Sequence, residues 1–248
     1  MKSLVVANWK MNPETMRQAK ALFEATRKAT DRARSVSVII APPVIFLREL
    51  TSQYKGAKLA FAAQNMHFES SGAHTGDISP EQIKDAKATA VIIGHAERRA
   101  CGETNEETRA KVKAALDAKL TPIICVGETK RDHEGEHFLF IKEQLKVALK
   151  DVTAQQVAKI IIAYEPVWAI GAVEAMDPAQ MHEMAIFIRK TVTATHGDKG
   201  LAVKILYGGS VDATNAHDMI EHGDVQGLLV GRASTDPEKF ASLIKSLA

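Results

Sequence analysis

The residue with the most informative surroundings is a glutamate at the end of a predicted strand. In AYEPVWAIG at 163–171, Glu165 follows an apolar run and precedes a proline and a loop of small residues. A carboxylate in such a place can be a structural ion-pair or helix-entry group. Under a loop that excludes water it would instead be a strong base. Glu165 is therefore a candidate general base, with the structural role as the alternative.

Two further polar groups stand at predicted strand ends. His95, in GHAERR at 94–99, directly precedes a predicted helix start, whose positive end would keep the imidazole neutral and able to donate a hydrogen bond. Lys10, in NWKMN at 8–12, follows the first strand. Taken singly, a histidine is usually structural and a strand-end lysine is usually solvated. A base, a neutral donor and a cation together could stabilise an enediolate.

Glycine-rich segments follow the last two predicted strands, in YGGSV at 207–211 and GLLVGRAS at 227–234. Glycines there expose backbone N–H groups, which bind phosphate well, although glycine pairs also serve plain tight turns. With the three groups above, these loops predict proton transfer next to a carbonyl on a small phosphorylated substrate.

These residues must be positioned by a repeating fold, because eight short apolar or β-branched runs alternate with longer segments of helical spacing. The predicted strands are Leu4–Asn8, Val36–Ala41, Lys58–Ala63, Ala90–Gly94, Thr121–Val126, Lys159–Tyr164, Val203–Gly208 and Gly227–Gly231. The predicted helices include Glu14–Thr30, Glu103–Ala118, Gly135–Lys150 and Pro178–Thr195. Apolar strands alternating with amphipathic helices indicate a parallel sheet covered by helices.

Eight such units favour an α/β fold of the (β/α)8 barrel type, with residues 1–248 as one domain. The alternative is an open doubly wound sheet, but no glycine-rich dinucleotide fingerprint follows an early strand. In a barrel the loops at the carboxyl ends of the strands build the active site. The polar residues at those ends are Asn8, Lys10, Gln64, Asn65, His95, Glu97, Glu128, Glu165, Tyr207–Ser210 and Gly231.

The composition excludes several classes of protein. With 46% hydrophobic and 25% charged residues and a net charge of +2, nothing indicates nucleic acid or a membrane as a partner. Cys101 and Cys125 are too few for a disulfide framework or a zinc cluster, and we expect a reducing compartment, the cytoplasm. No signal peptide is predicted at the amino terminus. No HExxH arrangement is present, and neither a metal nor a cofactor is expected.

The motifs resemble those of the triosephosphate isomerase family along nearly the whole chain. They are ANWKMN at 7–12, QN at 64–65, GHxERR at 94–99, ICVGE at 124–128, AYEPVWAIG at 163–171, YGGSV at 207–211 and LVGxAS at 229–234. The resemblance implies interconversion of dihydroxyacetone phosphate and glyceraldehyde 3-phosphate through an enediolate, a step of glycolysis and gluconeogenesis. It also implies a homodimer, in which the loop 65–79 reaches into the partner's site.

The resemblance implies a role for each matching residue. Glu165 would be the base, His95 the neutral electrophile, and Lys10 and Asn8 the groups that polarise the substrate, with Glu97 assisting near Lys10. The pairing of a glutamate base with a neutral histidine is the standard description of this family. The residues implied in phosphate binding are Gly171, Ser210, Gly231 and Arg232.

Four departures from the family pattern bear on function. Ala96 replaces a serine, and Arg232 replaces the second of two paired glycines. GAHTGD at 72–77 replaces GAFTGE in the dimer loop, and GAVEAM at 171–176 replaces GTGKxA in the lid over the site. The altered lid leaves a second interpretation open, a non-catalytic barrel that binds sugar phosphates. A different barrel enzyme acting on phosphorylated substrates would not need AYEPVW or GHxERR.

Overall fold

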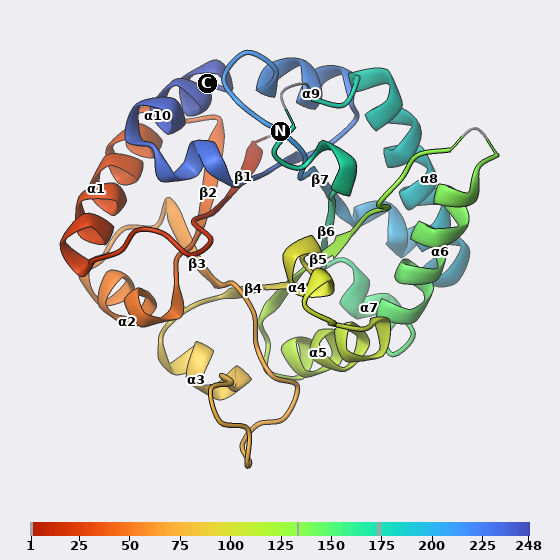
Figure 1. Cartoon of the computed structure of the whole chain (residues 1–248), viewed down its shortest axis with the longest axis horizontal. Coiled ribbons are helices and arrows are strands. Elements are labelled where there is room, and N and C mark those ends of the chain that lie inside the picture. Colours follow the sequence, from red (N-terminus) through yellow and green to blue (C-terminus); the bar gives the residue numbers. More distant parts are fainter. Residues whose placement is uncertain (1, 133, 173–174) are drawn as a thin grey trace.

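Eight parallel strands close into a barrel in the computed structural model, which describes residues 2–132, 134–172 and 175–248 (Figure 1). Each strand pairs with its neighbours in sequence, and the first pairs with the last, with Val5 opposite both Val38 and Leu228. The strands are β1 (Ser3–Asn8), β2 (Val36–Ala41), β3 (Leu59–Ala63), β4 (Ala90–Ile93), β5 (Thr121–Val126), β6 (Ile161–Tyr164), β7 (Lys204–Tyr207) and β8 (Gly227–Val230).

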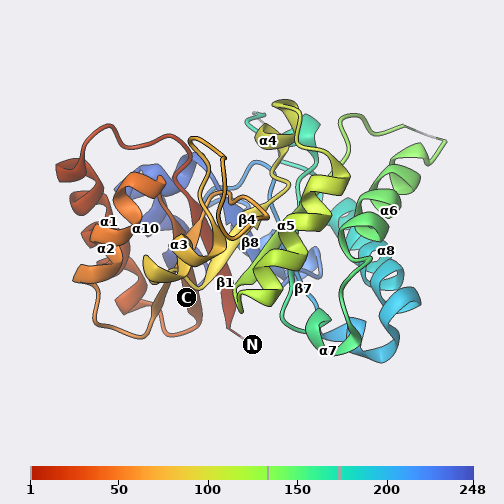
Figure 2. The same cartoon turned by 90° about the horizontal axis from the view of Figure 1, so that it is seen from below.

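Helices surround the barrel, as both views show (Figures 1 and 2). The α-helices are α1 (Met16–Arg32), α2 (Val44–Gln53), α3 (Pro80–Asp85), α4 (Ala96–Ala100), α5 (Asn105–Asp117), α6 (Glu136–Ala148), α7 (Ala154–Val157), α8 (Pro178–His196), α9 (Ala216–His222) and α10 (Pro237–Ser246). The 3-10 helices are η1 (Val167–Ala169), η2 (Gly197–Ala202) and η3 (Arg232–Thr235). No helix among these is long and apolar enough to cross a membrane.

Local sequence signals fix the starts of several helices. Thr15, Ser79, Thr104 and Thr153 each cap a helix, and each accepts a hydrogen bond from the backbone three residues on while a Gln or Glu side chain there bonds back. This reciprocal arrangement satisfies amide groups that a helix start leaves open. The polar residue before each apolar stripe thus defines where the chain turns around the barrel.

Alternation along the strands divides the core in two. In β1, Leu4 and Val6 pack inside the barrel, whereas Val5 and Ala7 pack outward under the helices. The inner cluster also takes small side chains such as Ala62 from the other strands. Because both faces of every strand are covered, the strands read as nearly continuous apolar runs.

The predicted (β/α)8 barrel is confirmed, and all eight predicted strands are present. Two strands, β2 and β5, coincide with the prediction at both ends, whereas Lys58, Gly94 and Gly231 among others lie just outside their strands. The short helix α4 begins where a helix start was predicted after His95, whereas the short helix α7 was not among the predicted elements. The four predicted helices are α1, α5, α6 and α8, each shifted by one or two residues at one end or both.

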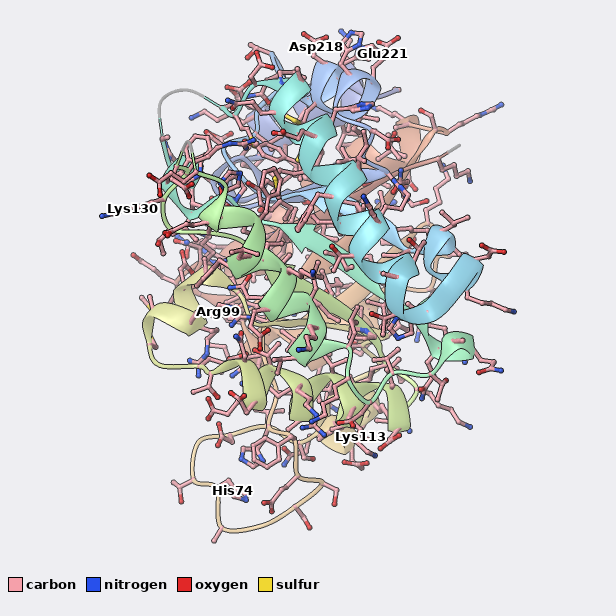
Figure 3. All side chains as sticks on the ribbon, turned by 90° about the vertical axis from the view of Figure 1, so that its right-hand side faces the viewer. His74, Arg99, Lys113, Lys130, Asp218 and Glu221 are labelled. Carbon is pink, nitrogen blue, oxygen red and sulfur yellow. The ribbon has the colours of Figure 1, made fainter. Side chains whose placement is uncertain are left out.

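One loop departs from the compact outline. Between β3 and α3, the chain from Asn65 to Ser79 projects beyond the ring of helices (Figure 1), and Figure 3 shows His74 on this projection. The base of the loop is fixed where the His67 N–H donates to the Ile78 carbonyl at 2.8 Å. Its rings stack internally, since His67 and His74 lie 3.9 Å apart between centroids.

Candidate active site

Glu165 is buried directly after β6 and is held mainly by the backbone. Its N–H donates to the Val126 carbonyl at 2.8 Å, which continues the pairing of β5 with β6. One carboxylate oxygen, Oε2, accepts the Ala96 N–H at 3.0 Å, and the other lies 3.1 Å from Nε2 of His95. Only 3% of the side chain is exposed. The carboxylate therefore has a defined position and faces one specific partner.

Two glycines make room for this glutamate. A Cβ atom on Gly127 would lie 1.8 Å from the Glu165 carbonyl oxygen, and one on Gly208 would lie 2.8 Å from Glu165 Cγ. Real Cβ atoms do not approach this closely, so any side chain at either position would displace the carboxylate. The absence of a side chain at Gly127 and Gly208 therefore allows Glu165 to lie where it does.

His95 is the N-cap of α4, as the sequence predicted. Its Nδ1 accepts the Glu97 N–H at 3.2 Å, which requires a lone pair on Nδ1. In a neutral ring the proton then lies on Nε2, the atom that faces Glu165. The helix has only five residues, so this direct bond, more than the helix dipole, favours the neutral tautomer.

The pKa of His95 results from opposing influences. Burial lowers it, the charge and hydrogen bond of the Glu165 carboxylate raise it, Glu97 raises it further, and Lys10 lowers it. The net pKa shift is upward. The contact with Glu165 is the main cause that raises the pKa of His95. If the Glu165 carboxylate turned away toward a substrate, burial and Lys10 would lower this pKa and favour the neutral ring.

Lys10 is fixed at its backbone while its ammonium group is partly exposed. It adopts a positive φ of 52°, an unfavourable conformation for a side chain with a Cβ. Its N–H donates to Asn8 Oδ1 at 3.0 Å, and its carbonyl accepts from the Gln64 side chain at 2.8 Å. The Nζ atom bonds Glu97 Oε1 at 2.5 Å. Asn8 and Gln64 thus maintain the strained backbone that directs the ammonium group.

A cavity of about 240 Å³ lies over these groups. Asn8, Lys10, His95 and Glu165 line one part of it. The rest is lined by the segments after β6, β7 and β8, including Gly171, Gly209, Ser210, Gly231, Arg232, Ala233 and Lys239. The structure therefore brings together all the predicted site residues except Glu97, which reaches the site through Lys10.

Comparison with known proteins agrees with this geometry. A family model described as triosephosphate isomerase matches residues 3–247. The chain belongs to the triosephosphate isomerase family. A protein of Endomicrobium trichonymphae named triosephosphate isomerase is 41% identical over 246 residues, which cover 98% of each chain. The predicted family, fold and enzyme class are confirmed, and nothing in these matches favours the non-catalytic alternative.

The family's serine at position 96 is absent, yet the glutamate remains anchored. The backbone N–H of Ala96 makes the contact to Glu165 Oε2. Arg232, at the second family glycine, does not adopt a positive φ, so it carries no left-handed backbone strain. It begins η3, and its Nη2 donates to the Gly171 carbonyl at 2.9 Å.

A buried hydrogen-bond group anchors the start of the lid. Glu128 accepts from the Tyr164 hydroxyl at 2.8 Å and from the Trp168 indole at 2.8 Å, also through Oε1. Burial, reinforced by the charge of Glu128, raises the pKa of Tyr164. At the other end of the lid, the Met176 N–H donates to the Tyr207 hydroxyl at 3.1 Å, and the Met176 side chain is buried. The departures at Val173 and Glu174 fall outside the described residues.

Sequence reasoning missed Lys239 as a lining residue. It lies in the first turn of α10, which begins after Asp236 caps the helix and η3 ends. A lysine in a helix start after a glycine-rich loop is an available signal, but the sequence does not show that α10 turns this lysine toward the cavity. Gly209 and Ala233 are likewise lining residues that had no assigned role.

Two other groups of reactive side chains lie apart from this chemistry. Cys125 is buried in the barrel interior, and burial, followed by Glu165, raises its pKa well above the ordinary value, which disfavours a nucleophilic thiolate. In the projecting loop, His67, His74 and Asp77 could approach a common metal ion. However, Nδ1 of His67 accepts the Glu69 N–H at 3.0 Å, so the neutral ring carries its proton on the nitrogen that faces Asp77.

Proposed function

We propose that this chain interconverts dihydroxyacetone phosphate and D-glyceraldehyde 3-phosphate, with Glu165 as the base and His95 as the neutral proton donor. The observation that carries the assignment is the 3.1 Å contact between Glu165 Oε1 and His95 Nε2 beneath a cavity lined by glycine-rich loops. A base and a hydrogen-bond donor side by side fit a substrate whose C–H and carbonyl groups are on adjacent carbons.

The proton transfers follow from this placement. Glu165 removes a proton from the carbon next to the carbonyl, and the Nε2–H of His95 donates to the oxygen on which negative charge develops. Lys10, with Asn8 beside it, lines the same part of the cavity and stabilises that charge. Glu165 then returns the proton to the neighbouring carbon, which completes the isomerisation without a cofactor.

The phosphate group would occupy the opposite part of the cavity. Gly171, Gly231 and the segment at Ser210 offer backbone N–H groups, and Arg232 adds a positive charge. Backbone N–H groups and guanidinium are both strong phosphate ligands. A phosphate held there positions the reacting carbons over Glu165 and His95, which lowers the entropic cost of reaching the transition state.

The assembly we propose is a homodimer formed through the loop 65–79. Its support is the projection of this loop beyond the ring of helices, together with the family's usual assembly. His74 and Asp77 replace an aromatic residue and a longer acid, so we expect a weaker contact than the family pattern would give. We further propose that residues 1–248 form one barrel domain. The two free cysteines of the chain favour a reducing compartment, the cytoplasm.

A coupled isomerase assay with glyceraldehyde 3-phosphate tests the activity. Turnover by the wild-type chain, lost in Glu165→Gln, is the expected result. Phosphate binding without turnover would instead support the non-catalytic sugar-phosphate barrel.

Sedimentation at micromolar concentration tests the assembly, and a fully active monomer would contradict the proposed dimer.

A further inference from the structure

Arg232 connects two segments that are far apart in the sequence. It follows β8, whereas Gly171 belongs to the lid after β6, and the Arg232 Nη2 donates to the Gly171 carbonyl at 2.9 Å. The packing is close, because a Cβ atom on Gly171 would lie 3.2 Å from that nitrogen. Gly171 also has a φ of +73°, so a side chain there would be strained as well as crowded.

A second side chain holds the neighbouring lid residue. The Ser210 hydroxyl, from the segment after β7, donates to the Ala172 carbonyl at 3.1 Å. Consecutive lid carbonyls are therefore bonded to side chains of the two loops that we assign to phosphate. Both residues also line the cavity, so each lies beside the lid and the proposed phosphate position.

The shape of a guanidinium group suits it for this double contact. It carries five N–H donors in a rigid plane, and the bond to Gly171 uses one of them. The remaining donors can engage a phosphate oxygen in the cavity that Arg232 lines. A glycine in its place, as in the family pattern, has no side chain with which to bridge the two.

We propose that Arg232 is a positioning residue that fastens the lid to the bound phosphate, so that phosphate occupancy and lid closure are coupled through one side chain. This inference rests on the proposed function. By holding Gly171 before substrate arrives, Arg232 reduces the ordering cost of closure. It acts on the lid and the phosphate, not on the reacting carbons.

The coupling has a chemical consequence that can be measured. If the lid opens over the enediolate, the electron pair of the enediolate expels phosphate from the adjacent carbon, the C–O bond breaks and inorganic phosphate is released. A closed lid opposes this loss because it shields the intermediate. The ratio of phosphate released to substrate isomerised therefore reports how well the lid is fastened.

The experiment compares Arg232→Gly and Arg232→Lys with Lys239→Met. The glycine variant restores the residue of the family pattern, and the lysine variant keeps the charge without the planar fork. Lys239→Met removes a positive charge from the same cavity wall without removing the Gly171 contact, and so measures the effect of charge alone.

We expect Arg232→Gly to raise KM about tenfold, about 1.4 kcal/mol, and to raise the fraction of phosphate lost severalfold. Arg232→Lys should have a KM closer to that of the wild type than Arg232→Gly has. Its fraction of phosphate lost should stay high. Lys239→Met should raise KM with the loss ratio of the wild type. If both Arg232 variants keep the wild-type ratio, Arg232 binds charge only and the coupling is wrong.

Trp168 fluorescence gives a readout independent of turnover. This indole, 39% exposed, lies just before Gly171, whereas Trp9 is fully buried. Titration with inorganic phosphate should change the Trp168 signal in the wild type and less in both Arg232 variants, with Trp168→Phe as the blank. An equal change in all of them would overturn the inference. An inactive wild type with the expected fluorescence pattern would instead reject the proposed function alone.

Discussion

The two sides of the cavity are built in different ways. On the side of β4 and β6, His95 and Glu165 are buried, and the backbone N–H groups of Glu97 and Ala96 bond Nδ1 of His95 and Oε2 of Glu165. On the side of β7 and β8, the contacts to the lid come from side chains, including that of the exposed Arg232. The first side suits groups that must hold one geometry, and the second suits a segment that must open for substrate.

The difference explains how the chain tolerates its departures from the family pattern. On the buried side, Glu165 keeps a contact to residue 96 without the serine hydroxyl, because the backbone N–H of Ala96 provides one. On the lid side, replacing glycine with Arg232 adds a contact to Gly171. A contact made by a backbone N–H survives a change of that residue's side chain, whereas a contact made by a side chain is gained or lost with one residue.

The sharpest test of the buried side is Glu165→Gln. We expect kcat to fall by several orders of magnitude while a phosphate-containing analogue still binds, because the amide cannot accept the substrate proton. Steady-state kinetics and analogue titration measure the two effects. Glu165→Asp, which keeps a shorter carboxylate, should retain more activity than the amide. Near-normal kcat in Glu165→Gln would remove this residue from its role.

Lys10→Met should have the next largest effect, on binding and turnover together. The variant deletes a charge that attracts the anionic substrate and stabilises the enediolate, so kcat/KM should fall about a hundredfold or more. Lys239→Met, which removes an equal charge from the phosphate end of the cavity, should affect KM more than kcat. Unchanged kinetics in Lys10→Met would make Lys10 a solvated strand-end residue.

A buried ion pair next to the β4 end tests how much the rigid side contributes to the free energy of unfolding. Glu103 accepts the Gly94 N–H at 2.9 Å and the Lys111 ammonium at 2.7 Å, and both charged side chains are at least nine-tenths buried. Lys111→Met leaves the buried Glu103 with only the longer contact to the half-exposed Arg98, 3.7 Å away, so the variant should lower the free energy of unfolding by about 3 kcal/mol.

Denaturant unfolding measures this loss, and the same chain offers a matched control. Lys113 forms an exposed pair with Asp117 on the same helix, α5, with more than half of each side chain exposed. Lys113→Met should change stability by less than about 1 kcal/mol. Equal losses in the two variants would show that burial of the Lys111 pair is not what matters.

The smallest expected effect is on the titration of His95. Since Glu165 raises the pKa of His95 against the lowering by burial, Glu165→Gln should lower that pKa. Imidazole NMR titration measures it, with Glu97→Gln as the weaker control, because Glu97 is the lesser upward influence. An unchanged pKa in Glu165→Gln would mean that Glu165 does not face the ring in solution.

The same shift has a consequence for stability. A histidine with a raised folded pKa stabilises the fold fully below its unfolded pKa of about 6.5, and this contribution disappears as pH rises through the folded pKa. Glu165→Gln should therefore lose this added stability in mild acid and not at alkaline pH. Thermal unfolding at several pH values checks the sign.

Much of the fold was predictable because its signals are local. Strands buried on both faces must be continuously apolar, and helices over them must be amphipathic, so alternation alone indicated the barrel. The same logic placed Glu165, His95 and Lys10 at one rim, because the carboxyl ends of parallel strands meet there. The short helix α7 escaped prediction because four residues carry too little periodicity.

What the sequence by itself determined is the set of chemical groups and the end of the barrel that carries them. Only the tertiary structure decided which atom faces which: that His95 presents Nε2 to Glu165, that the Ala96 backbone replaces a missing hydroxyl, and that Arg232 reaches the lid. These contacts join residues as many as 70 positions apart, and they depend on the stagger and tilt of strands around a closed barrel. Side-chain periodicity shows which face of a helix or strand is buried. A contact between two elements also depends on how those elements are placed relative to each other in space.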